Sequence, residues 1–312
     1  MSPVNDCAWP RLPFAEWKDT CATLHMWTQI VGKVRLVRTP WLNHSWHATL
    51  YLTSRGLTTS PIPCEARTFE INFDFIDHEL VIDAGEAGIR TVPLTARPVA
   101  DFYREVLAKL GELDIKVKIY AKPNEVVRCI PFADDYEHTA YVADHAQRFW
   151  RALVHADRVL KRFRSRFIGK CSPVHFFWGS FDLAVTRFSG RVAPQHPGGV
   201  PHLPDWVARE AYSHEVASCG FWPGSEEKPE ALFYAYAYPE PQGFAQAKVA
   251  PGTAVYDDAL REFLLPYEDV RTAAAPEETL LEFLQSTYEA AANCGKWDRA
   301  ALERSEKIPR AA

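Results

Sequence analysis

The most informative segment of the chain is Cys171-Ser-Pro-Val-His-Phe-Phe-Trp-Gly-Ser-Phe-Asp-Leu-Ala-Val-Thr-Arg-Phe-Ser-Gly-Arg191. Two runs of alternating residues flank Gly179-Ser180. This pair suits a two-residue type II′ turn, because glycine readily supplies the positive φ that such a turn requires. The turn would pair residues 175–178 with residues 181–184 in antiparallel order, so that Phe177 lies opposite Asp182. The sequence therefore predicts a β-hairpin with a defined register.

The two faces of this hairpin differ in chemistry, because residues directly opposite one another share a face. One face carries only apolar side chains and is expected to be core, namely Val174, Phe176, Trp178, Phe181, Leu183 and Val185. The other face carries His175, Phe177, Asp182, Ala184 and Thr186. On it, His175 and Asp182 become diagonal neighbours, roughly 7–8 Å apart at the backbone and within reach of a direct or water-mediated contact. A shift of one residue in register would separate them.

A histidine beside an aspartate has two interpretations. The aspartate fixes the tautomer of the imidazole, which makes it suited to act as a general base or a metal ligand. The alternative is a structural hydrogen bond inside a sheet. We take His175 and Asp182 as candidate catalytic residues.

Two arginines follow the hairpin and flank Phe188-Ser-Gly190. Arginines beside aromatic rings suit a carboxylate, a phosphate or a flat ligand, although surface ion pairing accounts for them equally well. We expect Arg187 and Arg191, with Phe177 and Tyr212, to bind the substrate.

A second unusual segment runs from Ala211 to Gly224 and contains adjacent His214 and Glu215. On a strand these two side chains point to opposite sides, so only one can join the His175 face unless a bulge intervenes. Either is a candidate for a second acid or base. With His175 and Asp182, a facial metal triad of two histidines and a carboxylate can be composed. The spacing matches no standard metal motif, so metal and cofactor remain open.

Outward from the hairpin, the periodicities predict an α+β fold with antiparallel or mixed sheets and helices. Helices are expected at residues 17–31, 99–110, 144–167 and 276–291, and strands at 34–37, 46–53, 69–75, 80–82, 90–94, 115–120, 211–218 and 232–238. The first helix should end at Gly32-Lys33. The loop from Gly190 to Trp206 is long enough to be a lid or a binding loop.

The order of elements is similar in the two halves of the chain. Each half is predicted to contain a helix, a hairpin, further strands and a closing helix. This favours two pseudo-repeated α+β lobes, residues 1–135 and 136–312, with the candidate site in the second. The alternatives are a coincidence of ordinary elements and a single compact unit.

Composition narrows the class of protein. The 312 residues are 47% apolar with a formal net charge of −5, which favours a large core and argues against nucleic acid or a membrane as the main partner. The seven cysteines include no C-x-x-C pair, no apolar stretch approaches the ~20 residues of a membrane span, and residues 1–10 do not resemble a signal peptide. We therefore expect a cytoplasmic protein with reduced thiols. The basic run from Arg158 to Arg166 is interpreted as a solvated helix face.

Several motifs resemble a known bacterial family, namely Leu24-His-Met-Trp-Thr-Gln-Ile-Val-Gly-Lys33, Arg55-Gly-Leu-Thr-Thr59, Ser172 to Arg191, Ala211 to Gly224 and Glu262-Phe-Leu-Leu-Pro-Tyr267. The family is known only as a domain of unknown function. The resemblance spans nearly the whole chain and implies a single-unit bacterial protein. It implies no activity, cofactor or catalytic residue.

The sequence favours an enzyme that acts on a small anionic or aromatic molecule by acid–base chemistry of His, Asp and Glu, with or without a metal. The alternative is a non-catalytic protein that binds a small molecule in the same aromatic cavity. A third hypothesis is an interaction protein without a deep pocket. No P-loop, dinucleotide-binding motif or serine-hydrolase elbow is present. Oligomeric state is left open.

Overall fold

The computed structural model describes residues 9–304, and its helices and sheets confirm the predicted α+β class. Within these residues the strands form two antiparallel sheets of six strands each. Cys7 and most of the N-terminal segment examined for a signal peptide lie outside the described residues.

The first sheet belongs to the N-terminal half and has the strand order β1-β2-β4-β5-β6, with β3 paired to β4. Its fourth strand alternates as expected, with Phe69, Ile71 and Phe73 buried. The elements of this half are α1 (Phe14–Arg38), η1 (Asn43–Ser45), β1 (Tyr51–Leu52), β2 (Gly56–Thr58), β3 (Ile62–Cys64), β4 (Arg67–Asp74), β5 (Glu79–Asp83), η2 (Gly85–Ala87), β6 (Ile89–Pro93), α2 (Val99–Glu112) and η3 (Phe132–Asp134).

The second sheet belongs to the C-terminal half and has the order β11-β12-β10-β9-β8-β7. The elements of this half are α3 (Ala143–Ser165), β7 (His175–Phe177), β8 (Asp182–Val192), α4 (Asp205–Ala211), β9 (His214–Trp222), β10 (Leu232–Tyr238), β11 (Val255–Asp257), β12 (Glu262–Pro266), α5 (Tyr267–Thr272), α6 (Pro276–Cys294) and α7 (Arg299–Leu302). The division into two pseudo-repeated lobes, residues 1–135 and 136–312, stays a prediction.

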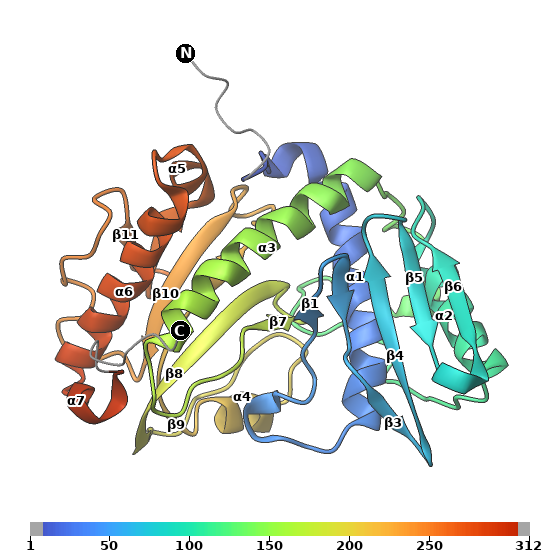
Figure 1. Cartoon of the computed structure of the whole chain (residues 1–312), viewed down its shortest axis with the longest axis horizontal. Coiled ribbons are helices and arrows are strands. Elements are labelled where there is room, and N and C mark those ends of the chain that lie inside the picture. The colour runs from blue at the N-terminus through green and yellow to red at the C-terminus, as the bar shows by residue number, and fades with distance from the viewer. Residues whose placement is uncertain (1–8, 305–312) are drawn as a thin grey trace, which may run out of the picture.

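The helices lie on particular faces of the sheets (Figure 1). Helices α3 and α6 cross one face of the second sheet and pack against β8, β9 and β10. Helix α1 lies beside the first sheet and contacts both α2 and α3. The edges of the two sheets meet where Leu50 and Phe176 exchange backbone hydrogen bonds of 2.9 Å, and one hydrophobic core extends through both halves.

The predicted register of the hairpin is confirmed, with Phe177 opposite Asp182 and His175 opposite Ala184. All six side chains assigned to its core face are buried. The predicted turn is wrong, because residues 178–181 form a four-residue loop in which Phe181 has φ 60° and its N–H donates to the Phe177 carbonyl at 2.8 Å. Phe181 tolerates this backbone because its ring is stacked between His25 and Phe149.

Three other predicted elements differ from the structure. Helix α1 continues through Gly32 to Arg38 and absorbs the strand predicted at 34–37, because residues Val34 and Arg35 are buried on the helix. Residues 115–120 contain no strand, and only Tyr51–Leu52 of the 46–53 segment is a strand. Gly32 is required inside the helix because a Cβ there would lie 2.2 Å from the Trp178 ring.

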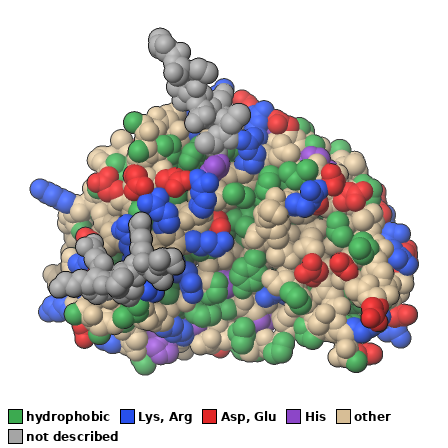
Figure 2. Space-filling model, in the orientation of Figure 1, with side chains coloured by type: hydrophobic (Ala, Val, Ile, Leu, Met, Phe, Trp, Pro, Cys, Tyr) green, Lys and Arg blue, Asp and Glu red, His purple; other side chains and the backbone are tan. Residues whose placement is uncertain are grey.

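The basic run on α3 faces solvent, as predicted. Figure 2 shows Lys and Arg side chains gathered over α3 and α6 beside a row of acids. Arg158 and Arg162 pair with Glu277, and Arg162 also pairs with Glu278 at 2.8 Å. Exposed pairs of this kind contribute little to stability. Within residues 9–304, no helix is both long enough and apolar enough to cross a bilayer.

Substitution of Gly32 by alanine tests how α1 is held on the hairpin. The added methyl group would overlap the buried Trp178 ring, so we expect Gly32→Ala to lower the free energy of unfolding by about 1–3 kcal/mol. A matched control is Gly111→Ala in α2, where no atom lies within 4 Å of the added Cβ and the helix should gain roughly 0.5–1 kcal/mol. Urea denaturation measures both. Equal midpoints for Gly32→Ala and the wild type would contradict this packing.

Candidate functional site

A cavity of about 790 Å³ lies against the face of the second sheet that α3 and α6 leave uncovered. Alternate residues of three strands form its floor, namely Asp182, Ala184, Thr186 and Phe188 of β8, Val216 and Ser218 of β9, and Tyr234 and Tyr236 of β10. The residues between them face the helices, as Cys219 and Ala235 do beside Phe163 and Tyr288. Strand periodicity therefore separates the cavity from the helix-covered core.

The cover of the cavity comes from distant parts of the chain. It consists of the end of α1, residues 41–48, residues 120–125 and the segment 200–211 that includes α4. Trp41 holds α4 in place, because its indole N–H donates to Glu210 at 2.9 Å and its ring packs 5.0 Å from that of Trp206. The long loop that was predicted as a lid or binding loop thus supplies cavity-lining residues.

Most of the cavity wall is apolar and aromatic. The wall includes Leu36, Trp41, Trp46, Phe177, Trp178, Phe188, Val200, Leu203, Trp206 and Val207. Polar groups gather at the end near the β7–β8 turn, where the lining residues are Lys33, Asn124, Glu125, Ser180, Asp182 and Tyr234. We call these six residues the polar end. An apolar cavity with a few convergent polar groups is typical of a small-molecule site.

Asp182 is the best-anchored acid of the polar end. The hydroxyls of Ser180 and Tyr234 donate to its two carboxylate oxygens. Its exposed fraction is 7%. Burial raises the pKa of Asp182, and the two hydroxyl donors oppose that shift by favouring the charged form.

Glu125 is the second acid, carried on a segment without regular secondary structure. Its backbone N–H donates to Pro201 at 2.9 Å, which ties the segment to the cover. Its carboxylate lies so close to Gly179 that a Cβ there would be 1.9 Å from Oε1. Burial and the charge of Asp182 raise the pKa of Glu125 to about 7. Both protonation states of this carboxyl group are therefore populated at neutral pH.

A third buried acid lies near the polar end but outside the cavity lining. Glu262 begins β12, and burial together with the charges of Asp182 and Asp257 raises its pKa to about 7. Burial also lowers the pKa of Lys33 to about 8. Perturbed titratable groups that converge in one cavity are a feature of functional sites.

Two further tyrosines, Tyr212 and Tyr236, extend the polar surface of the cavity beyond the polar end. The hydroxyls of Tyr212 and Tyr236 are 2.9 Å apart, and burial raises the pKa of Tyr212 to about 12. Thr186 and Ser218 share a hydrogen bond of 2.9 Å beside them. These hydroxyls stay neutral at physiological pH and can donate to or accept from a ligand.

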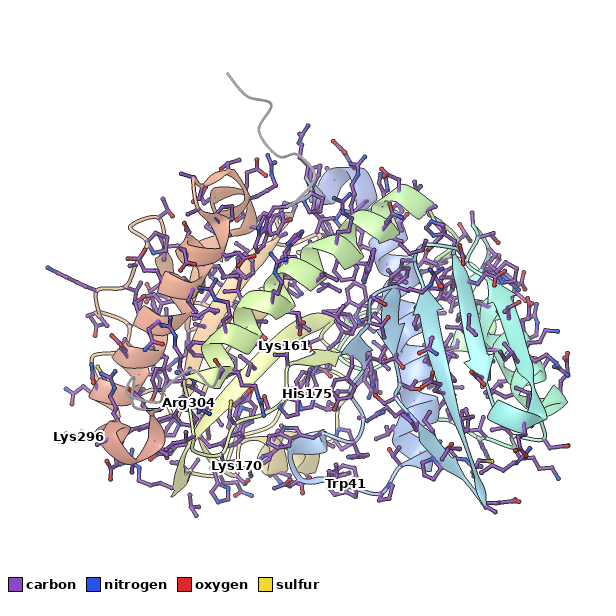
Figure 3. All side chains as sticks on the ribbon, viewed as in Figure 1. Trp41, Lys161, Lys170, His175, Lys296 and Arg304 are labelled. Atoms are coloured by element: carbon purple, nitrogen blue, oxygen red, sulfur yellow. The ribbon has the colours of Figure 1, made fainter. Side chains whose placement is uncertain are left out.

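His175 lies on the same sheet face as Asp182 but does not line the cavity. It is 1% exposed, and its Nδ1 is 2.8 Å from the Thr49 hydroxyl. In Figure 3 it lies in the interior between the two sheets, whereas Trp41 and Lys170 lie near the edge of the molecule. Burial lowers the pKa of His175 to about 3, so the ring is neutral. Asp182 is thus hydrogen-bonded to Ser180 and Tyr234, whereas His175 is hydrogen-bonded to Thr49. The two side chains predicted to pair have separate partners.

The other residues predicted for the site are divided between the two faces of the sheet. Phe177 and Tyr212 line the cavity with Asp182. His214 is near His44, with ring centroids 6.4 Å apart. Arg187 faces the helices, where its guanidinium lies 3.4 Å from the centre of the Phe163 ring.

Glu215 and Arg191 lie away from the cavity as well. They form an ion pair of 2.6 Å, and Arg191 also donates to the backbone carbonyls of Gly295 and Lys296 after α6. The metal triad predicted from His175, Asp182 and either His214 or Glu215 is therefore not formed in the structure. Within residues 9–304, no group of three His, Cys, Asp or Glu side chains is arranged to hold a metal ion.

Sequence reasoning missed Lys33 and Glu125. Lys33 was assigned to the end of a helix, and Glu125 occupies an irregular segment whose position periodicity does not define. Tyr234 and Tyr236 did give a signal, because a stripe of tyrosines on alternate strand positions indicates one sheet face, here the cavity floor.

The fold and cavity thus define an α+β protein with a largely apolar cavity that ends in the carboxyl groups of Asp182 and Glu125. A family model described as a family of unknown function (DUF5996) matches residues 9–304, and the chain belongs to this family. No curated protein and no solved structure matches the chain significantly.

Glu262→Gln tests the energetic cost of the buried acids without changing the cavity lining. Between pH 4.5 and about 7 the unfolded chain loses the Glu262 proton while the folded chain retains it, so this group lowers the free energy of unfolding as pH rises. Relative to wild type, the variant should therefore gain roughly 1–3 kcal/mol in free energy of unfolding from pH 5 to pH 8.

Denaturant titrations of the variant and the wild type at pH 5 and pH 8 measure this difference. Other titrating groups are shared by the two proteins, so their pH dependence cancels when the two free energies of unfolding are subtracted. Parallel curves with a constant offset would show that Glu262 titrates normally in the folded protein.

Proposed function

We propose that this protein is an enzyme that performs acid–base chemistry on a small, largely apolar molecule bound in the cavity. The observation that carries the proposal is the pairing of two poorly solvated carboxyl groups, Asp182 and Glu125, at one end of an aromatic-lined cavity of about 790 Å³. This volume is in the range that holds one drug-sized molecule.

The character of the cavity favours a neutral or aromatic substrate over an anionic one. The two arginines expected to hold an anion, Arg187 and Arg191, lie on the helix side of the sheet. The polar end carries two acids, which repel an anion when ionised. The aromatic rings of Phe177, Trp178 and Phe188 offer flat apolar surface to the body of the substrate.

In this proposal the two carboxyl groups have different roles. Glu125, with a pKa of about 7, takes a proton from the substrate or gives one to it near neutral pH. Asp182 is fixed by Ser180 and Tyr234, and its charge influences which protonation state Glu125 adopts. Two acids in different environments are a recurring arrangement for paired acid and base roles.

Glu125 replaces His175 as the proposed proton-exchanging residue, because His175 is sealed beneath Thr49, Trp46 and Tyr51. We infer that His175 supports the β7–β8 hairpin from the interior. The cover formed by α4 and residues 200–204 would exclude water from the reacting groups. A cytosolic location is part of the proposal, supported by the free state of the six cysteines within residues 9–304.

The experiment is an incubation of the purified protein with a cell extract of small molecules, followed by mass spectrometry of the mixture over time. We expect one or a few compounds to be consumed. Turnover should fall by at least about a hundredfold in Glu125→Gln, because proton transfer by a positioned side chain contributes about 10²–10⁴-fold. It should also fall in Asp182→Asn, because the charge of Asp182 helps to raise the pKa of Glu125. Glu86→Gln, an exposed glutamate in η2, is the matched control and should retain full turnover.

Two outcomes would overturn the assignment as an enzyme. Retention of a compound without its conversion would identify a non-catalytic binding protein that uses the same cavity. Turnover that persists in both carboxyl variants would move the chemistry away from the polar end.

A further inference from the structure

Lys33 is a buried cation in the wall of the cavity. It lies in α1, is 2% exposed, and its ammonium donates to the side-chain oxygen of Asn124. The Trp178 and Tyr120 rings lie 5.3 and 5.5 Å from its Nζ. All four residues line the cavity.

No carboxylate within residues 9–304 lies within ion-pair distance of Lys33. This is unusual, because buried lysines are almost always paired. A structural role in holding residues 120–124 against α1 explains the contact with Asn124. It does not explain why a lysine is placed in the cavity wall together with Glu125.

Burial makes the Lys33 amine more reactive than an ordinary one. With a pKa of about 8, about a tenth of the Lys33 side chains are neutral at pH 7, compared with about one in three thousand for a lysine of ordinary pKa. Only the neutral amine has the lone pair that attacks carbon, so desolvation in an apolar pocket activates lysine for imine formation.

We propose that Lys33 is a nucleophile that forms an imine with an aldehyde or ketone entering the cavity. The proposal rests on the proposed function in one respect, since it uses the same cavity and assigns Glu125 as the proton donor. The substrate class is then a carbonyl compound with an apolar or aromatic body that fits between Phe177, Trp178 and Phe188.

Lys33 and Glu125 together supply the nucleophile and the proton that imine formation requires. The Lys33 nitrogen attacks the carbonyl carbon, a C–N bond forms, and a proton moves from nitrogen to oxygen to give a carbinolamine. Glu125 in its protonated form then donates its proton to the hydroxyl group, the C–O bond breaks, and water leaves. The products are a protonated imine and the Glu125 carboxylate, whose negative charge stabilises the cation. No oxidant or reductant is required.

The test is reductive trapping with benzaldehyde and sodium cyanoborohydride at pH 7, followed by peptide mass spectrometry to locate benzylated lysines. We expect Lys33 to be labelled on the order of a hundredfold faster than the other lysines, from its larger neutral fraction. Lys33→Arg keeps the cation but should abolish the adduct. Glu125→Gln should slow the labelling of Lys33, because dehydration of the carbinolamine then lacks its proton donor.

Lys170→Arg is the matched control. Lys170 also packs on aromatic rings, 4.7 Å from the centre of the Phe188 ring, but it is exposed and does not line the cavity. Labelling at Lys33 should be unchanged in this variant.

Binding of benzyl alcohol, which has no carbonyl group, is measured in parallel by ligand-observed NMR. Benzyl alcohol binding without preferential labelling of Lys33 would overturn the imine and leave the cavity proposal standing. If benzyl alcohol does not bind and Lys33 is not labelled preferentially, both the imine and the cavity proposal would be overturned.

Discussion

The chemistry of the cavity is governed by two carboxyl groups, Asp182 and Glu125, that are poorly solvated at its polar end. Moving a carboxylate out of water is costly unless donors or cations compensate, and otherwise the group retains its proton. Asp182 is compensated by hydroxyl groups of Ser180 and Tyr234. Glu125 has no comparable donors within residues 9–304, and its pKa is raised to about 7. The difference between the two acids makes the polar end a candidate for proton transfer.

The positions of these acids follow from the arrangement of the two halves. The second sheet provides Asp182 and Tyr234, whereas α1 and residues 120–125 of the first half provide Lys33 and Glu125. The Leu50–Phe176 hydrogen bonds and the contact of Gly32 with Trp178 bring the halves together beside the β7–β8 turn. The polar end is therefore a product of long-range packing, and neither half contains it alone.

The sequence predicted the parts of the fold that local patterning controls. Alternation along residues 174–185 defines both the register of the hairpin and the face of Asp182, since a slip of one residue would move each side chain to the opposite face of the sheet. The turn was wrong because Phe181, a residue that rarely adopts positive φ, is held there by tertiary stacking on His25 and Phe149. Helix α1 was predicted too short because Gly32 is a site of close packing and not a helix end.

The candidate site was predictable only in part, for the same reason. Asp182 and Phe177 were identified from strand positions and line the cavity. Tyr212 also lines it, but from the end of α4 and not from the strand predicted at 211–218. Glu125 and Lys33 reach it through contacts that span most of the N-terminal half, which no local pattern encodes. Arg187 and Arg191 were assigned to substrate by residue type. Strand alternation directs Arg187 to the helix side of the sheet, and Arg191, within a pairing irregularity between Phe188 and Val192, donates to backbone carbonyls after α6.

The most direct test of this account is the pKa of Glu125 in the folded protein, followed by NMR of ¹³C-labelled side-chain carboxyl groups and assigned with Glu125→Gln. We expect a carboxyl resonance that titrates near pH 7 in the wild type and disappears in the variant. Titration of Glu125 near its ordinary value of about 4.3 would show that the acid is well solvated, and would contradict the proposed polar end.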